Sequence, residues 1–91
     1  MTEADYTYEV ARTGDALLKF KSSPAGKFLW RKADEVVESA KNSLATCNPM
    51  DSEEIKALQN HIEVSRMFKQ WVSEGISSGE AALIQLENVP A

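Results

Sequence analysis

The side chains that most often do chemistry in proteins are scarce in this sequence. His61 is the only histidine and Cys47 the only cysteine. A zinc site would therefore need carboxylates for most of its ligands, and no pair of strong ligands has the spacing that places both on one helix face. We predict no metal site and no cofactor. His61 is typical of the surface or the core edge of a helix.

A catalytic pair made of Cys47 and His61 also lacks support. The chain would have to fold back over more than two helical turns to join them, and no third residue is apparent to orient the pair. A small buried apolar position suits Cys47 better. Adjacent carboxylates such as Glu53 and Glu54 point about 100° apart on a helix, as on a solvated face. The sequence predicts a protein with no catalytic residues, not an enzyme.

The elements that would position these side chains are helices. Apolar residues recur at helical spacing, and nowhere do β-branched and aromatic residues alternate with period two over a strand's length. The predicted helices cover about residues 5–20, 23–46, 52–74 and 78–86.

Local signals predict where these helices begin and end. Ser23 and Pro24 are typical of an N-cap and a first helical residue. The Asn48-Pro49 step disfavours helix, and residues 51–54 look like a capping box that starts the next one. Gly75 is expected to end the third helix, and residues 77–80 offer a capping box for a short last helix.

These elements predict a single all-α domain over residues 1–91. Its centre is an antiparallel hairpin of two long helices, with shorter helices at each end, in a bundle of three to four helices. A hydrophobic content of 43% allows a modest core. Gly14 lies inside the apolar stripe of the first helix, where it costs about 1 kcal/mol relative to alanine. It indicates either close approach of a neighbouring helix or a kink.

Composition also bears on the cellular setting. A single cysteine permits no internal disulfide, which fits a reducing cytoplasm. The first five residues carry two acids, and no apolar run follows them, so we expect neither a signal peptide nor a membrane span. A net charge of −4 favours solubility and disfavours general affinity for nucleic acid.

One segment has a strong charge bias. Residues 19–32 contain five basic side chains and no acid. Aromatic residues are interleaved with the bases Lys27, Arg31 and Lys32, around the start of a helix. Three interpretations stay open: a solvated basic face on which Phe28 and Trp30 anchor this helix to the first one, docking of an acidic protein, or nucleic-acid binding.

The third helix is apolar on two sides. One stripe suits a core, while Met67, Phe68 and Trp71 lie near the opposite side. These residues either pack against another helix of the same chain or bind a partner, since tryptophan and methionine are favoured at interfaces. We predict them as a partner-binding patch, with Lys27, Arg31 and Lys32 as a second one.

The pattern of residues 23–27, 55–60, 70–76 and 79–81 resembles small all-helical proteins of tailed bacteriophages. The resemblance implies a role in virion assembly, in the host cytoplasm or in the particle, or binding to a host enzyme or defence complex. It brings no active site with it. The sequence thus favours a non-enzymatic interaction module whose partner is a protein, foremost a second copy in a homo-oligomer.

Overall fold

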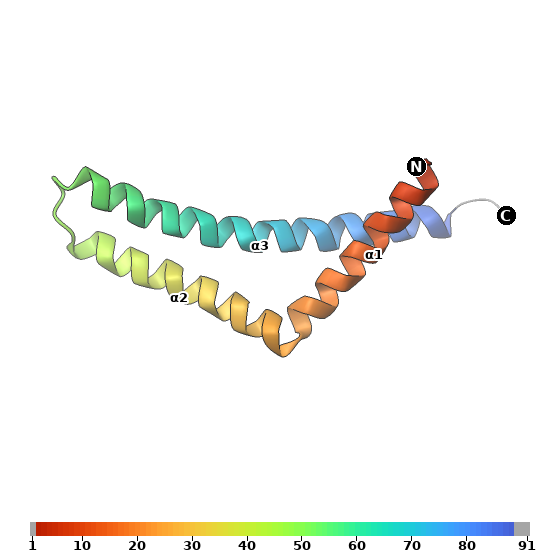
Figure 1. The fold of residues 1–91 in the computed structure, drawn as a ribbon, viewed down its shortest axis with the longest axis horizontal. Coiled ribbons are helices and arrows are strands. Elements are labelled where there is room, and N and C mark those ends of the chain that lie inside the picture. Colours follow the sequence, from red (N-terminus) through yellow and green to blue (C-terminus); the bar gives the residue numbers. More distant parts are fainter. Residues whose placement is uncertain (1, 89–91) are drawn as a thin grey trace.

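The computed structural model describes residues 2–88 and is helical almost throughout. Its three helices are α1 (Glu3–Ser22), α2 (Pro24–Thr46) and α3 (Ser52–Glu87), and residues 2–88 contain no strand (Figure 1). The all-α class predicted from the sequence is confirmed.

The predicted starts of α2 and α3 are also confirmed. The hydroxyl of Ser23 accepts a hydrogen bond from the backbone N–H of Gly26 at 3.1 Å, and Pro24 is the first residue of α2. The carboxylate of Asp51 accepts one from the N–H of Glu54, also at 3.1 Å. Each side chain satisfies a backbone donor that has no partner inside its helix.

The prediction of a fourth helix was wrong. α3 runs for 36 residues, straight through Gly75 and through residues 77–80 that were expected to cap a new helix. No glycine in the part of the chain that the structure describes has a positive φ, so Gly75 does not adopt the left-handed conformation of a helix end.

Packing against α1 explains why these glycines lie inside a helix. A Cβ atom built on Gly79 would lie 2.6 Å from the Cα of Gly14, and one on Gly75 would collide with the side chain of Leu17. Gly14 and Gly79 are both buried. The expectation of a close approach at Gly14 is therefore confirmed, and tertiary packing overrides the low helix propensity of glycine.

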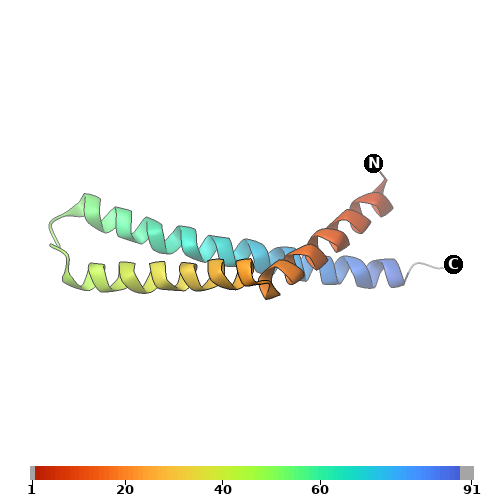
Figure 2. The ribbon, with the colours of Figure 1, turned by 60° about the horizontal axis from the view of Figure 1, so that its bottom comes forward.

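The three helices form an elongated molecule. α2 and α3 lie side by side and run in opposite directions, while α1 crosses the C-terminal half of α3 (Figures 1 and 2). A single residue, Ser23, separates α1 from α2. The molecule measures 64 × 26 × 18 Å, and its radius of gyration of 18.5 Å far exceeds the value of about 12 Å for a compact domain of this length.

This shape leaves little interior. The buried apolar residues are small, namely Ala33, Ala40, Val72 and Ala82, and no large side chain among the described residues is fully buried. The accessible surface is 6842 Å², whereas a compact monomer of this mass exposes about 5,300 Å². The chain therefore exposes roughly 1,500 Å² more than a compact fold would.

Candidate protein-interaction surfaces

One flank of α3 carries an exposed apolar stripe, which we call the Trp71 stripe (Val64, Met67 and Trp71). These residues are three or four positions apart and so are neighbours on the helix surface. Val64 is 56% exposed and Trp71 59% exposed, and Met67 is half-buried. Phe68, predicted as part of the same patch, turns instead toward α2. Its ring centroid lies 6.0 Å from that of Trp30, with the ring planes tilted by 58°.

Trp30 joins all three helices at the corner between α1 and α2. The ammonium group of Lys21, on α1, lies 4.6 Å from the ring centroid of Trp30, and that of Lys69, on α3, lies 5.1 Å from it. Lys69 also forms an ion pair with Asp34 of α2. Cations over an indole face are attracted by its π electrons. Trp30 is therefore a structural residue, as the sequence interpretation of an anchor expected.

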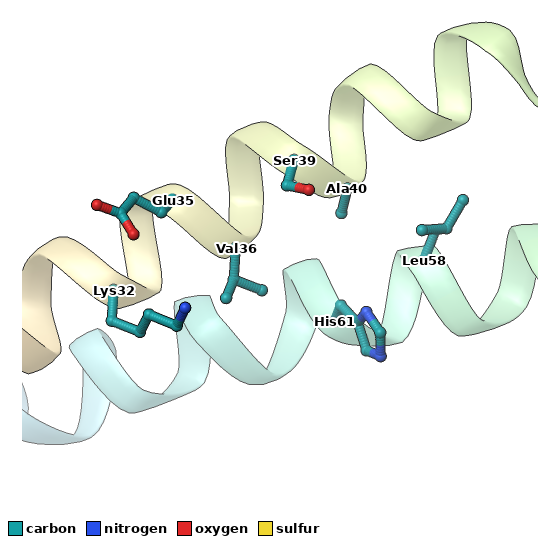
Figure 3. A pocket seen from close by; sticks show the side chains of 7 residues that line it. All are labelled: Lys32, Glu35, Val36, Ser39, Ala40, Leu58 and His61. Carbon is teal, nitrogen blue, oxygen red and sulfur yellow. The ribbon is translucent and has the colours of Figure 1, made fainter.

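The structure divides the predicted basic patch between two flanks of α2. Lys27 and Arg31 line an open depression beside Trp30, together with Lys21 and Asp34. Lys32 belongs to a different depression between α2 and α3, where its side chain extends toward α3 (Figure 3).

Phe28 lies between these two flanks, on the outer face of α2. It is 61% exposed and about 140° around the helix from the buried Ala33. The interpretation in which Phe28 anchors α2 to the first helix is therefore wrong. Arg31 and Lys32 are its neighbours on this surface, at sequence separations of three and four residues, and Lys27 lies about 100° around the helix from it. We call these four residues the basic elbow.

A narrow apolar groove follows the crossing of α1 and α3. Its walls are Ala11 and Leu18 of α1 and Ile76 and Leu83 of α3, with Gly14 and Gly79 at its base. Leu18 is 47% and Leu83 51% exposed. The carboxylate residues Asp15 and Glu80 also line the groove. We call it the crossing groove. The sequence analysis missed it because it depends on where α1 meets α3.

The crossing groove and the Trp71 stripe face different directions. Trp71 and Ile76 are five residues apart, which places them about 140° apart around α3. The line along which α1 contacts α3, through Gly79, lies between them. The molecule thus presents two separate apolar surfaces.

His61 and Cys47 show no catalytic arrangement. His61 is exposed, and its ring points away from α2 at the edge of an open depression of about 370 Å³ (Figure 3). Val36, Ala40 and Leu58 form the apolar part of that depression. Cys47 caps the C-terminus of α2 and is half-buried rather than buried, with its thiol donating a weak hydrogen bond to the carbonyl of Leu44 at 3.4 Å.

Within residues 2–88, no three histidine, cysteine or acidic side chains come together in a way that would hold a metal ion. None of the described helices combines the length and apolar character needed to cross a bilayer. Comparisons with protein-family models, with curated proteins and with solved structures found no match to this chain.

Proposed function

We propose that this chain is a non-enzymatic interaction subunit that self-associates, so that its helices bury against another protein the apolar surface that they leave open in the monomer. The observation that carries the proposal is the incomplete core. The buried apolar residues are alanines and one valine, while Trp71, Phe28 and Leu83 are more than half exposed.

The size of the exposed surface leaves room for a protein–protein interface of standard size. Stable interfaces bury about 800 Å² on each partner. The excess of roughly 1,500 Å² over a compact monomer is enough for one such interface or for two. Aromatic residues in the middle of an interface contribute most of the binding energy, and Trp71 in the Trp71 stripe is the best-placed candidate.

The resemblance to small phage proteins supports a setting in virion assembly for this subunit. An elongated helical subunit with more than one contact surface suits a repeated structure better than a soluble enzyme. The alternative from the same resemblance is a chain that binds a host enzyme or defence complex, in which case the exposed surface would meet a different protein.

The test is the mass of the purified chain in solution over a wide range of concentration. Light scattering must accompany size-exclusion chromatography, because a molecule 64 Å long elutes early even as a monomer. We expect a mass that rises with concentration, and a melting temperature that rises with it, since association stabilises only the folded chain.

A monomeric mass and a constant melting temperature at all concentrations would contradict self-association. Thermal unfolding also separates self-association from aggregation. An aggregate forms after unfolding and does not raise the melting temperature of the folded state.

A further inference from the structure

We infer that copies of this chain associate head to tail, with the basic elbow of one copy docked on the crossing groove of the next. This inference rests on the proposed self-association and adds which two surfaces meet. It concerns surfaces other than the Trp71 stripe.

The donor surface combines an apolar anchor with positive charge. Phe28 is 61% exposed on the outer face of α2, and Lys27, Arg31 and Lys32 surround it on that helix. An exposed aromatic ring among long basic side chains has the composition of an interface centre with a charged rim. No acidic residue lies in the sequence between Asp15 and Asp34. Asp34 lines the depression beside Lys27 and Arg31 but forms an ion pair with Lys69. Glu35 lies in the depression that contains Lys32, so basic residues outnumber acidic ones on this surface.

The acceptor surface has the opposite charge. Packing of α1 on α3 brings together two acidic stretches that are far apart in the sequence. Residues 3–15 carry a net charge of −3, and residues 70–87 contain three glutamates and no base. At the crossing groove, Asp15 lies on one helix and Glu80 on the other, with Glu87 two turns beyond Glu80 on α3. Asp15 forms an ion pair with Lys19 at 2.9 Å, so Glu80 and Glu87 supply most of the negative charge that a partner would meet.

The groove has aliphatic walls against which an aromatic ring can pack. Its volume of about 110 Å³ is smaller than the cavity of about 150 Å³ that holds benzene, so the ring of Phe28 would enter it only in part. A phenyl ring would enter between Leu18 and Leu83, and the basic side chains beside it would then lie near Asp15 and Glu80. Opposite charges at the rim favour this pairing and disfavour contact between two elbows or two grooves.

The opposite charges of the basic elbow and the crossing groove therefore favour a second copy of this chain as the partner that binds in the groove. The two surfaces are different patches of one chain, so the contact is heterologous and propagates into a ring or an open filament rather than closing as a two-fold dimer. Each chain has surface to spare for both contacts, given its excess of roughly 1,500 Å².

Two charge-reversed variants test this pairing. The elbow variant is Lys27→Glu/Arg31→Glu/Lys32→Glu, and the groove variant is Glu80→Lys/Glu87→Lys. All five side chains are exposed, so circular dichroism should show the helix content of the wild type. We expect each variant alone to associate at least about tenfold more weakly than the wild type at low salt.

Mixing the two variants gives the decisive result. The groove variant keeps an intact elbow that fits the intact groove of the elbow variant, and the reversed elbow is again opposite in charge to the reversed groove. An equimolar mixture should therefore recover the association that neither variant shows alone. The association between the two variants should be weaker in ~0.5 M salt than in ~0.05 M salt, because salt screens charges at an exposed rim. Phe28→Ala should weaken wild-type association about tenfold without loss of helix.

Matched controls carry the same change of charge elsewhere on the molecule. Lys41→Glu/Lys56→Glu/Arg66→Glu matches the elbow variant, and Glu38→Lys/Glu63→Lys matches the groove variant. These five residues are exposed and lie outside both surfaces. Both controls should associate as the wild type does.

Two results would overturn the inference while leaving self-association intact. In the first, the wild-type chain self-associates and the elbow and groove variants, each measured alone, form oligomers of the same mass as the wild type. In the second, the two weakened variants stay monomeric when mixed. Loss of binding to a DNA duplex by the elbow variant at unchanged mass would assign the elbow to nucleic acid instead. A wild-type chain that is monomeric throughout would contradict the proposed function itself.

Discussion

Gly14 of α1 and Gly79 of α3 bring two helix backbones into direct contact. A Cβ atom on Gly14 would lie 2.6 Å from the Cα of Gly79 and 2.9 Å from the carbonyl oxygen of Gly75. Backbone atoms cannot turn aside as a flexible side chain can. The absence of both side chains is therefore what allows α1 to cross α3 at this depth.

Replacing either glycine by alanine should loosen this crossing. Alanine improves helix propensity by about 1 kcal/mol, but overpacking at a tight contact costs about 1–3 kcal/mol or more. Because a collision with backbone is hard to relieve, we expect Gly14→Ala and Gly79→Ala each to lower the free energy of unfolding by about 1–2 kcal/mol. Urea unfolding of dilute protein, followed by circular dichroism, measures this change.

Gly75→Ala is the matched control within the same helix. Its new methyl group would meet only the end of the Leu17 side chain, which can change rotamer. The gain in helix propensity should then offset most of the cost. A Gly75→Ala variant as unstable as Gly79→Ala would show that the whole groove, and not the glycine crossing, limits the approach of α1.

The two tryptophans should respond differently to the same substitution. Trp30 contacts Phe68 and two lysine ammonium groups at the junction of the helices, whereas Trp71 is 59% exposed. Trp30→Ala should lower the free energy of unfolding by about 2 kcal/mol or more. Trp71→Ala should change it by no more than about 0.5 kcal/mol in dilute protein, while lowering the oligomer mass seen by light scattering.

A loss of helix content in Trp71→Ala would make Trp71 a core residue and would remove the main support for the Trp71 stripe as an interface. An unchanged mass with unchanged helix content would show that self-association, where it occurs, uses the other surfaces.

The pair of Asp15 and Lys19 gives a prediction about protonation. The Lys19 ammonium donates to the Asp15 carboxylate at 2.9 Å, and this hydrogen bond, with the attraction between the charges, raises the pKa of Lys19 above 10.5. Asp15→Asn should bring that pKa back toward its ordinary value, as NMR titration of the Lys19 side chain would show. Because the pKa is raised on folding, the pair favours the folded state below pH 10.5 and loses this effect as the pH rises through the folded-state pKa.

A Lys19 pKa that stays raised in Asp15→Asn would identify another acid as its partner. Glu80→Gln is the control: Glu80 lines the same groove, but the ion pair of Lys19 is with Asp15, so this substitution should leave the pKa of Lys19 raised.

Local chemistry made much of the fold predictable. The helix starts at Ser23 and Asp51 depend on hydrogen bonds between residues three positions apart, so the local sequence is enough to predict them. The end expected at Gly75 was wrong because its cause is not local. A glycine signals either a helix end or a close contact, and only the position of α1 decides between them.

The candidate surfaces were predictable to different degrees. Helical periodicity placed Trp71 on a second apolar side of its helix but left open whether that side is core or surface, and the basic character of residues 27–32 follows directly from their charges. The division of Lys27 and Lys32 between two flanks, and the turn of Phe68 toward Trp30, depend on how α2 lies on α3. The acidic crossing groove joins residues more than 60 positions apart, and the only local sign of it was the absence of bases after Lys69.

The unbroken course of α3 has a geometric consequence. Its 36 residues make a rod of about 54 Å at a rise of 1.5 Å per residue. In an array of docked copies, the length of this helix would set the repeat distance along the array. Inserting seven residues near its middle should lengthen that repeat by about 10 Å while rotating its two ends by only about 20°, a change that electron microscopy of the array would resolve.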